Sequence, residues 1–167
     1  MLTPIGDARP TSAAETLISH LTLLGTHSMS HTMKQLDAVI VGAGFAGIYM
    51  LHTARKLGLT ARVFEAGDGA GGTWYWNRYP GARCDVESMQ YSYQFDKDLE
   101  QEWGWTERYA AQPEILTYID YVIDRFDLAR DMQFNTRVNA ATFDEVNGHW
   151  IVETSDGEQY SSEFFLL

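Results

Sequence analysis

The sequence predicts an α/β fold in which a parallel βαβ unit is followed by an antiparallel β-meander. Three observations support this prediction. A short apolar run over residues 36–41 leads directly into a glycine-rich turn at residues 42–47. A helical pattern and a second apolar run then end at Glu65. Between residues 132 and 165 the apolar side chains change to the alternating period of β-strands.

The first predicted strand leads into a glycine pattern whose geometry has a physical purpose. Its residues are nearly all apolar, as in a parallel strand buried on both faces: Leu36, Ala38, Val39, Ile40 and Val41. Gly42, Gly44 and Gly47 then match G-x-G-x-x-G. The first glycine of this pattern makes a tight turn, the second lets the backbone approach a pyrophosphate, and the third lets helix and strand pack closely. The helix that follows would direct its free N–H groups at that pyrophosphate.

A helix and a second strand complete the predicted unit. From Phe45 onward apolar residues recur every three or four positions, and Gly58 is placed to end the helix. Ala61, Val63 and Phe64 then lead to Glu65, which lies 18 residues after Gly47. Such folds place a ribose-binding carboxylate about 20 residues after the glycines. We therefore predict a Rossmann-like unit that binds a dinucleotide; the alternative is a glycine-rich turn in an unrelated α/β domain.

A second glycine pattern follows the acid but lacks the context of the first. Gly67, Gly69 and Gly72 also fit G-x-G-x-x-G, yet the next residues are Thr73, Trp74, Tyr75, Trp76 and Asn77, with no helical pattern. We predict a glycine-rich loop here, without a helix and without a second nucleotide site.

Composition restricts the partners that this chain can have. The 167 residues suggest one domain, and the formal net charge of -11 argues against nucleic acid or an anionic membrane as the main partner. No apolar stretch approaches the roughly 20 residues of a membrane span. The one cysteine, Cys84, excludes an internal disulfide and fits a reducing cytoplasm, so we expect a cytoplasmic protein.

The first 33 residues have little to pack and lack the pattern of a signal peptide. We expect residues 1–33 to be a disordered N-terminal extension and residues 34–167 to form the dinucleotide-binding domain. Ser12 and Glu15 could cap a short helix. His20, His27 and His31 have no acid or cysteine nearby, so no metal site is expected.

Aromatic side chains are concentrated after the second glycine pattern. Four of the five tryptophans fall between Trp74 and Trp105, together with several tyrosines. Planar side chains can wall a planar ligand, or they can pack a core beneath long loops. We expect the set as a whole to be core, and Trp74 and Tyr91 to contact a ligand.

Opposite charges follow the aromatic residues. Pro80 and Gly81 mark a turn that would bring Arg83 and Asp85 back toward the glycine loop. The alternative is a surface ion pair of little energetic weight. Cys84 lies between them without an evident histidine partner, so a catalytic thiol is not expected.

The rest of the chain predicts one helix and three strands. Pro113 begins a helix that runs to Phe126, with Ile115, Ile119 and Val122 on one face. Turns at Asn147–Gly148 and Asp156–Gly157 then separate three antiparallel strands, which form a meander inserted after the βαβ unit. Because the last strand ends in apolar residues without a following turn, we expect a fragment of a longer protein.

The stretch from Gly71 to Ser88 resembles that of Baeyer–Villiger monooxygenases, flavoproteins that convert ketones to esters or lactones with NADPH and oxygen. The likeness runs from about Asp37 to Leu167 and covers the first FAD-binding segment of that family. Other flavin monooxygenases and glutathione-reductase-like proteins share the glycine loop and the acid but not the run from Trp74 to Asp85. Disulfide reductases also need a redox cysteine pair, whereas this chain has only Cys84.

The resemblance implies a role for individual residues. The FAD pyrophosphate would face Gly42, Gly44, Ala46 and Gly47, and Glu65 would hold the adenosine ribose. The flavin side would be lined by Thr73, Trp74, Tyr75, Trp76, Asp85 and Tyr91. Main-chain atoms of Val138 would meet the adenine. Arg83, Cys84 and Asp85 would also border the nicotinamide site, with Asp85 as a catalytic residue that steadies an arginine from a later segment.

The resemblance also implies cofactors and a reaction for the full-length protein. FAD and NADPH would be the cofactors, and a ketone and O2 the substrates: NADPH reduces FAD, oxygen forms a peroxyflavin, and this attacks the ketone. The NADPH-binding glycine pattern and the family signature are absent from the 167 residues, so the chain would stop before the NADPH-binding domain and be inactive alone. Two alternatives are another two-dinucleotide FAD oxidoreductase and a nucleotide-binding module without activity.

Overall fold

A computed structural model of the chain describes residues 33–167. The predictions for the N-terminal extension, its capping box and its histidines fall almost wholly on residues 1–32 and so lie outside the described residues. No helix in the described part of the chain is long and apolar enough to cross a membrane.

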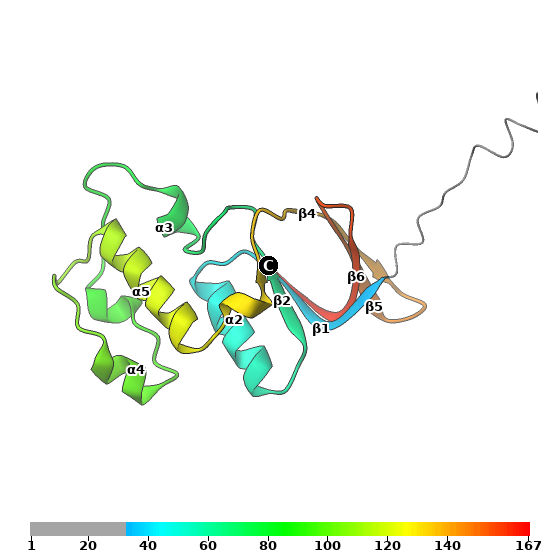
Figure 1. The fold of residues 1–167 in the computed structure, drawn as a ribbon, viewed down its shortest axis with the longest axis horizontal. Helices are drawn as coiled ribbons and strands as arrows, with labels where there is room; N and C mark the ends of the chain where they lie inside the picture. Colours follow the sequence, from blue (N-terminus) through cyan, green and yellow to red (C-terminus); the bar gives the residue numbers. More distant parts are fainter. Residues whose placement is uncertain (1–32) are drawn as a thin grey trace, which may run out of the picture. The chain divides into compact units, whose positions relative to one another are not determined.

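One six-stranded mixed sheet organises the described residues (Figure 1). Its order is β3-β2-β1-β6-β5-β4, with β1 at Lys34–Val41, β2 at Ala61–Phe64, β3 at Met132–Gln133, β4 at Val138–Asp144, β5 at His149–Thr154 and β6 at Gln159–Leu166. Neighbouring strands among β3, β2, β1 and β6 are parallel. Strand β5 is antiparallel to both of its neighbours, β6 and β4. The predicted α/β class and the antiparallel meander are thereby confirmed.

The predicted βαβ unit is present. Helix α2 (Phe45–Lys56) connects β1 to its parallel neighbour β2 and packs against both strands. Gly58 takes a φ of 79° directly after the last turn, where its N–H donates to the carbonyl of Arg55. This left-handed conformation strongly favours glycine, so Gly58 ends the helix as expected.

A helical segment lies between β2 and β3. It comprises α3 (Thr73–Trp76), the 3-10 turn η1 (Ser88–Tyr91), α4 (Lys97–Glu102), α5 (Gln112–Arg125) and the 3-10 turn η2 (Ala129–Asp131). Helix α5 confirms the helix predicted from Pro113. The expectation that no helix follows Gly72 was wrong, because α3 forms one helical turn there. Helix α3 has only four residues, too few to show a helical period in the sequence. It is also bonded by a residue far along the chain, since the Gln112 side chain donates to the Trp74 carbonyl at 2.5 Å.

Two hydrophobic clusters use opposite faces of the sheet. Ile40 belongs to a cluster with Ile48 of α2 and Ile115 of α5. Its neighbour Val39 belongs to a second cluster, with Phe64, Val152 and Tyr160. The rings of Phe64 and Tyr160 lie 4.8 Å apart. Strand residues alternate between the two faces, so β1 is buried on both.

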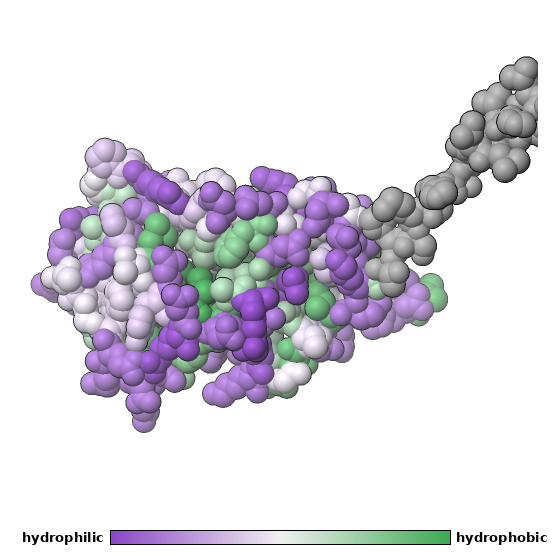
Figure 2. Space-filling view, in the orientation of Figure 1, coloured by the Kyte–Doolittle hydropathy of each residue, from purple (hydrophilic) through white to green (hydrophobic). Residues whose placement is uncertain are grey.

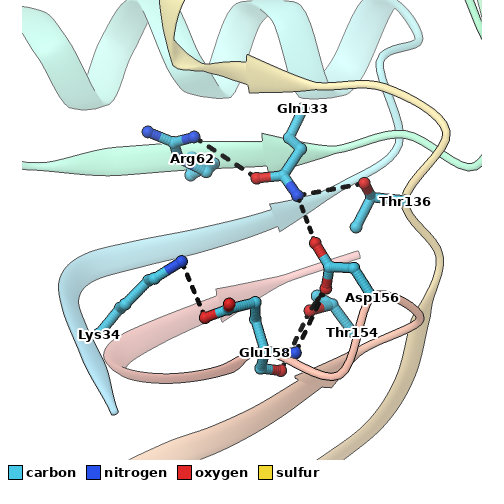
Figure 3. A network of polar contacts seen from close by, with 7 residues as sticks. All are labelled: Lys34, Arg62, Gln133, Thr136, Thr154, Asp156 and Glu158. Carbon is cyan, nitrogen blue, oxygen red and sulfur yellow. Dashed lines mark hydrogen bonds and ion pairs between the residues drawn. The ribbon is translucent and has the colours of Figure 1, made fainter. Parts of the chain in front are cut away.

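Strand β6 belongs to both parts of the sheet, which the sequence did not indicate. It pairs parallel with β1 and antiparallel with β5. A polar network joins the β5–β6 turn to β3 and β1 (Figure 3): Gln133 of β3 donates to Asp156 at 2.9 Å, and Lys34 of β1 pairs with Glu158 at 2.8 Å. The meander is therefore continuous with the parallel sheet rather than an independent insertion.

Candidate functional site

The glycine turn between β1 and α2 requires glycine for different reasons at different positions. Gly42 has a φ of 92°, in the left-handed region. A Cβ at Gly47 would lie 1.9 Å from the carbonyl oxygen of Gly42, so no side chain fits. A Cβ at Gly44 would meet nothing closer than the Gly72 Cα at 3.5 Å, and Gly44 has an ordinary φ of -83°. The packing of the chain thus requires glycine at position 47 but not at position 44.

Glu65 is buried at the end of β2, with only 4% of its surface exposed. Its two carboxylate oxygens accept hydrogen bonds from the main-chain N–H groups of Ala43, at 2.8 Å, and Gly67, at 2.7 Å. The carboxylate therefore ties the first glycine turn to the loop that follows β2. Each oxygen has a second lone pair that can accept from another donor.

The second glycine run packs directly against the first. The Gly71 N–H donates to the Ala43 carbonyl at 2.8 Å, and Gly72, at a φ of 54°, lies beside Gly44. The sequence predicts only a glycine-rich loop here. No local pattern could have revealed their contact with the first turn, because it joins segments about 28 residues apart through tertiary packing.

A cavity of about 590 Å³ opens at the N-terminus of α2. Three segments line it: the glycine turn at Gly44, Phe45 and Ala46; the start of α3 at Gly71, Thr73 and Trp74; and the loop of Gln90, Tyr91, Ser92 and Tyr93. The first N–H groups of a helix have no acceptor within it, so this cavity is suited to an anionic group. A volume of this size is typical of a cofactor site.

Aromatic rings form the walls of the cavity. Trp74 is buried, and the Tyr91 ring meets it edge-on with centroids 5.5 Å apart. Tyr91 also contacts Phe45 edge-on at 5.5 Å. Burial, followed by the nearby charges of Asp85 and Cys84, raises the pKa of the Tyr91 hydroxyl, so this group stays protonated at neutral pH. The two aromatic residues singled out from the sequence thus lie together at one cavity.

The loop before Tyr91 is held by contacts with the segment that precedes α5. Cys84 is buried, and its N–H donates to the Ala110 carbonyl at 3.0 Å. The Ser88 hydroxyl donates to the Glu107 carbonyl at 2.7 Å and accepts from the Ala110 N–H at 2.8 Å. These bonds fix the backbone on both sides of Asp85, whose side chain is exposed.

Arg83 and Asp85 do not form the ion pair that the sequence left open as an alternative. The Arg83 guanidinium instead pairs with Glu107 at 2.7 Å and donates to the Tyr109 carbonyl. Within residues 33–167 the Asp85 carboxylate has no ion-pair partner. Its charge remains available to a group outside the described residues.

Tyr75, Trp76 and Val138 are among the residues that the resemblance assigns to cofactor binding but that do not line this cavity. Tyr75 packs over Gly67 and Gly69, and the exposed Trp76 meets it edge-on at 5.0 Å. The Arg78 guanidinium lies over the Tyr75 ring, 4.3 Å from its centroid. Val138 begins β4, next to the second hydrophobic cluster. Thr73 and Trp74 are therefore the members of the 73–76 run that line the cavity.

Fold and cavity together define a Rossmann-like α/β domain, with an aromatic cavity at its glycine turn. Residues 40–101 match the family described as "NAD(P)-binding Rossmann-like domain".

Within that class the chain is similar to Baeyer–Villiger and related flavin monooxygenases. It is 50% identical over 131 residues to a phenazine N-monooxygenase of Lysobacter antibioticus, covering 78% of this chain and 24% of that protein. It is 45% identical over 131 residues to the methyl acetate-forming acetone monooxygenase of a Gordonia species, covering 78% of this chain and 25% of that protein. The resemblance inferred from residues 71–88 is confirmed.

Solved structures agree with these sequence matches. An oxidised steroid monooxygenase bound to NADP superposes with a TM-score of 0.78 at 57% identity, covering 79% of this chain and 25% of that one. A closed cyclohexanone monooxygenase also gives a TM-score of 0.78, at 49% identity, covering 80% and 25% of the two chains. The chain spans about a quarter of the length of the relatives that it matches.

Proposed function

We propose that this chain is the FAD-binding part of a flavin monooxygenase that uses NADPH and O2. The observation that carries the proposal is the cavity at the N-terminus of α2, walled by Trp74 and Tyr91. It combines a place for a pyrophosphate with flat apolar walls for an isoalloxazine ring. The similarity to FAD-binding monooxygenases supports the choice of FAD over other dinucleotides.

The residues present fit FAD. Gly44 lines the cavity without a side chain beside the helix N-terminus, where N–H groups can bind the pyrophosphate. Glu65 keeps lone pairs that can accept from ribose hydroxyls, and the Val138 main chain would meet the adenine. Trp74 and Tyr91 would contact the ring system, which supplies the redox chemistry when bound. Ala46 and Gly47 would adjoin the phosphates.

For the longer protein we propose ketone oxygenation with NADPH as reductant. Relatives with names that state this substrate class include acetone, cyclohexanone and cyclopentanone monooxygenases. Arg83, Cys84 and Asp85 would border the nicotinamide, and Asp85 would orient an arginine beyond these residues. The expected cytoplasmic location is part of this proposal.

A second candidate is oxygenation at a ring nitrogen. A relative at 50% identity carries the name phenazine N-monooxygenase. Both reactions would use the FAD domain in the same way, since the flavin supplies the chemistry. Product analysis with a ketone and with a phenazine, in the longer protein, distinguishes ester from N-oxide.

FAD binding by the chain tests the proposal directly. Purified protein carrying this chain should be yellow, or should bind added FAD in a fluorescence titration more tightly than it binds NAD. A colourless protein that prefers NAD would contradict the assignment.

A further inference from the structure

We propose that Tyr93 and Tyr118 are positioning residues that fix the cavity loop against the N-terminus of α2. This inference rests on the proposed function, because it concerns the same cavity. It adds two residues that neither the glycine pattern nor the aromatic run singled out.

The two tyrosines join three segments by consecutive hydrogen bonds. The hydroxyl of Tyr118, on α5, accepts from the Tyr93 main-chain N–H at 2.7 Å. The Tyr93 hydroxyl in turn donates to the main-chain carbonyl of Phe45 at 2.7 Å. Phe45 is the first residue of α2. Helix α5, the cavity loop at residues 90–93 and the helix N-terminus are thus held at a fixed spacing.

Ring packing reinforces this arrangement. The Tyr93 ring lies 5.2 Å from that of Phe45 and 6.0 Å from that of Tyr118. Tyr118 is 1% exposed, so its hydroxyl is shielded from solvent that could replace the bond to Tyr93. Burial also raises the pKa of the Tyr93 hydroxyl, which therefore remains a donor to Phe45 throughout the neutral range.

The spacing matters because the N-terminus of α2 and the loop at residues 90–93 each contribute residues to the lining of the cavity. Phe45 and Gly44 line the cavity from the N-terminus of α2, and Tyr91, two residues before Tyr93, lines it from the loop. A shift of the loop would move the Tyr91 ring relative to both Phe45 and Trp74. Since the hydroxyls of Tyr93 and Tyr118 are engaged with the main chain, they act on a bound ring system through Tyr91 and Phe45.

Tyrosine-to-phenylalanine variants test the proposal with a control on the same helix. Y93F and Y118F each remove one hydrogen bond of the connection and keep the ring. Y121F also changes a tyrosine of α5, but its hydroxyl donates to Glu102 of α4, at 2.6 Å and away from the cavity. Affinity for FAD is measured by fluorescence titration, and visible circular dichroism of the bound flavin is recorded at saturation.

Y93F and Y118F should bind FAD about three- to tenfold more weakly, as expected for the loss of one net hydrogen bond. Both should also change the visible circular dichroism, which reports the position of the aromatic walls around the flavin. Y121F should stay within twofold of the parent with an unchanged spectrum. Thermal melting identifies any variant that fails to fold. If Y93F does not fold, Y118F decides, since it leaves the Tyr93 hydroxyl in place.

Failure of this inference differs from failure of the proposed function. A parent protein that binds no FAD contradicts the proposed function. A parent that binds FAD, together with folded Y93F and Y118F variants of parental affinity and spectrum, overturns the positioning role. Equal changes in all three variants also overturn it, because they would reflect α5 in general rather than the connection to the cavity.

Discussion

Two glycines of the turn between β1 and α2 lack a side chain for different reasons. Gly47 is required by the fold, since a Cβ there would collide with the Gly42 carbonyl. Gly44 has room for a Cβ and an unstrained backbone, so its absent side chain matters chiefly to whatever approaches the helix N-terminus.

Gly44→Ala should therefore keep the fold and lose FAD. We expect far-UV circular dichroism and melting close to the parent, with FAD affinity reduced at least tenfold, because the added methyl group occupies the approach of the pyrophosphate. Gly47→Ala is the matched control and should unfold the domain. Parental FAD affinity in Gly44→Ala would show that the phosphates bind elsewhere.

Glu65 has a structural role besides the one proposed for it. Its carboxylate accepts two main-chain N–H groups at the glycine turn, and Glu65→Ala would leave both without an acceptor. An unsatisfied buried donor costs about 1–3 kcal/mol. We predict that Glu65→Ala lowers the free energy of unfolding by about 2 kcal/mol or more even without FAD. Urea denaturation of the ligand-free variant measures this, and an unchanged midpoint would refute it.

Asp85 provides the test of catalysis. In the longer protein an arginine beside the flavin would stabilise negative charge there. The Asp85 carboxylate, which has no ion-pair partner within residues 33–167, would hold that arginine in one orientation. Asp85→Ala should retain FAD and lose about tenfold or more of its oxygenation rate, which corresponds to roughly 1.4 kcal/mol. The measurement is ester formed per NADPH consumed, alongside flavin content. Parental rates would reduce Asp85 to a surface residue.

At the scale of elements, α2 meets the end of α5 through a histidine. His52 stacks on Phe95 with centroids 4.2 Å apart and meets Phe126 edge-on at 4.8 Å. Burial lowers the pKa of His52 below its usual 6.5; Lys56 and Arg55 also lower it, and Asp96 partly opposes them. The folded state thus favours neutral His52.

This shift predicts a pH dependence of stability. The stabilisation associated with neutral His52 is present above about pH 6.5, the usual value of the unfolded chain, and is lost as the pH falls through the lower folded value. His52→Phe keeps an aromatic ring and should flatten the fall in urea midpoint between about pH 7.5 and pH 5.5. His149→Phe, at an exposed position, is the control. An identical pH profile in His52→Phe would contradict the assignment.

Elements with a local period could be predicted from the sequence, whereas those created by tertiary contacts could not. The helical spacing of apolar residues in α2, its end at Gly58 and the apolar face of α5 can each be recognised from a short continuous stretch of sequence. Helix α3 is one turn long, and β3 has two residues that pair only with β2. Neither is long enough to show a period.

The same distinction applies to the site. The glycine turn, Glu65, Trp74 and Tyr91 could be found because their residue types and order carry the chemistry. The contact of Ala43 with Gly71 and the bonds joining Tyr118, Tyr93 and Phe45 could not. They depend on how loops distant in sequence meet, which periodicity does not report.

At the scale of the whole described region, apolar atoms gather near the centre of one face, between hydrophilic groups (Figure 2). This part of the surface corresponds to α2 and the C-terminal end of β6 in Figure 1. Met50, which is 41% exposed, and Leu167, which is 92% exposed, line a cavity of about 230 Å³ together with Ile40 and Leu166. The glycine turn lines the same cavity, through Gly42, Gly44 and Gly47.

Strand β6 joins the two parts of the sheet, because it pairs with β1 on one side and with β5 on the other. Removing residues 159–167 would free the inner edge of β1 and separate β5 from the parallel strands. We predict that a chain ending at Glu158 aggregates on expression, because an unpaired apolar strand edge recruits other chains. Size-exclusion chromatography of the shortened and parent chains, run in parallel, tests this. A monomeric shortened chain with parental circular dichroism would contradict it.

The shared strand has a consequence for how the protein is made. During synthesis β1 and β2 leave the ribosome early, and their local crossover can form at once, but the other edge of β1 must wait for Tyr160 and the residues after it. Pairings so distant in sequence form slowly. A nascent chain therefore carries an open β1 edge until the residues of β6 have been made. This interval is where a chaperone would be needed, and slowing elongation before β6 would lower the yield of folded protein.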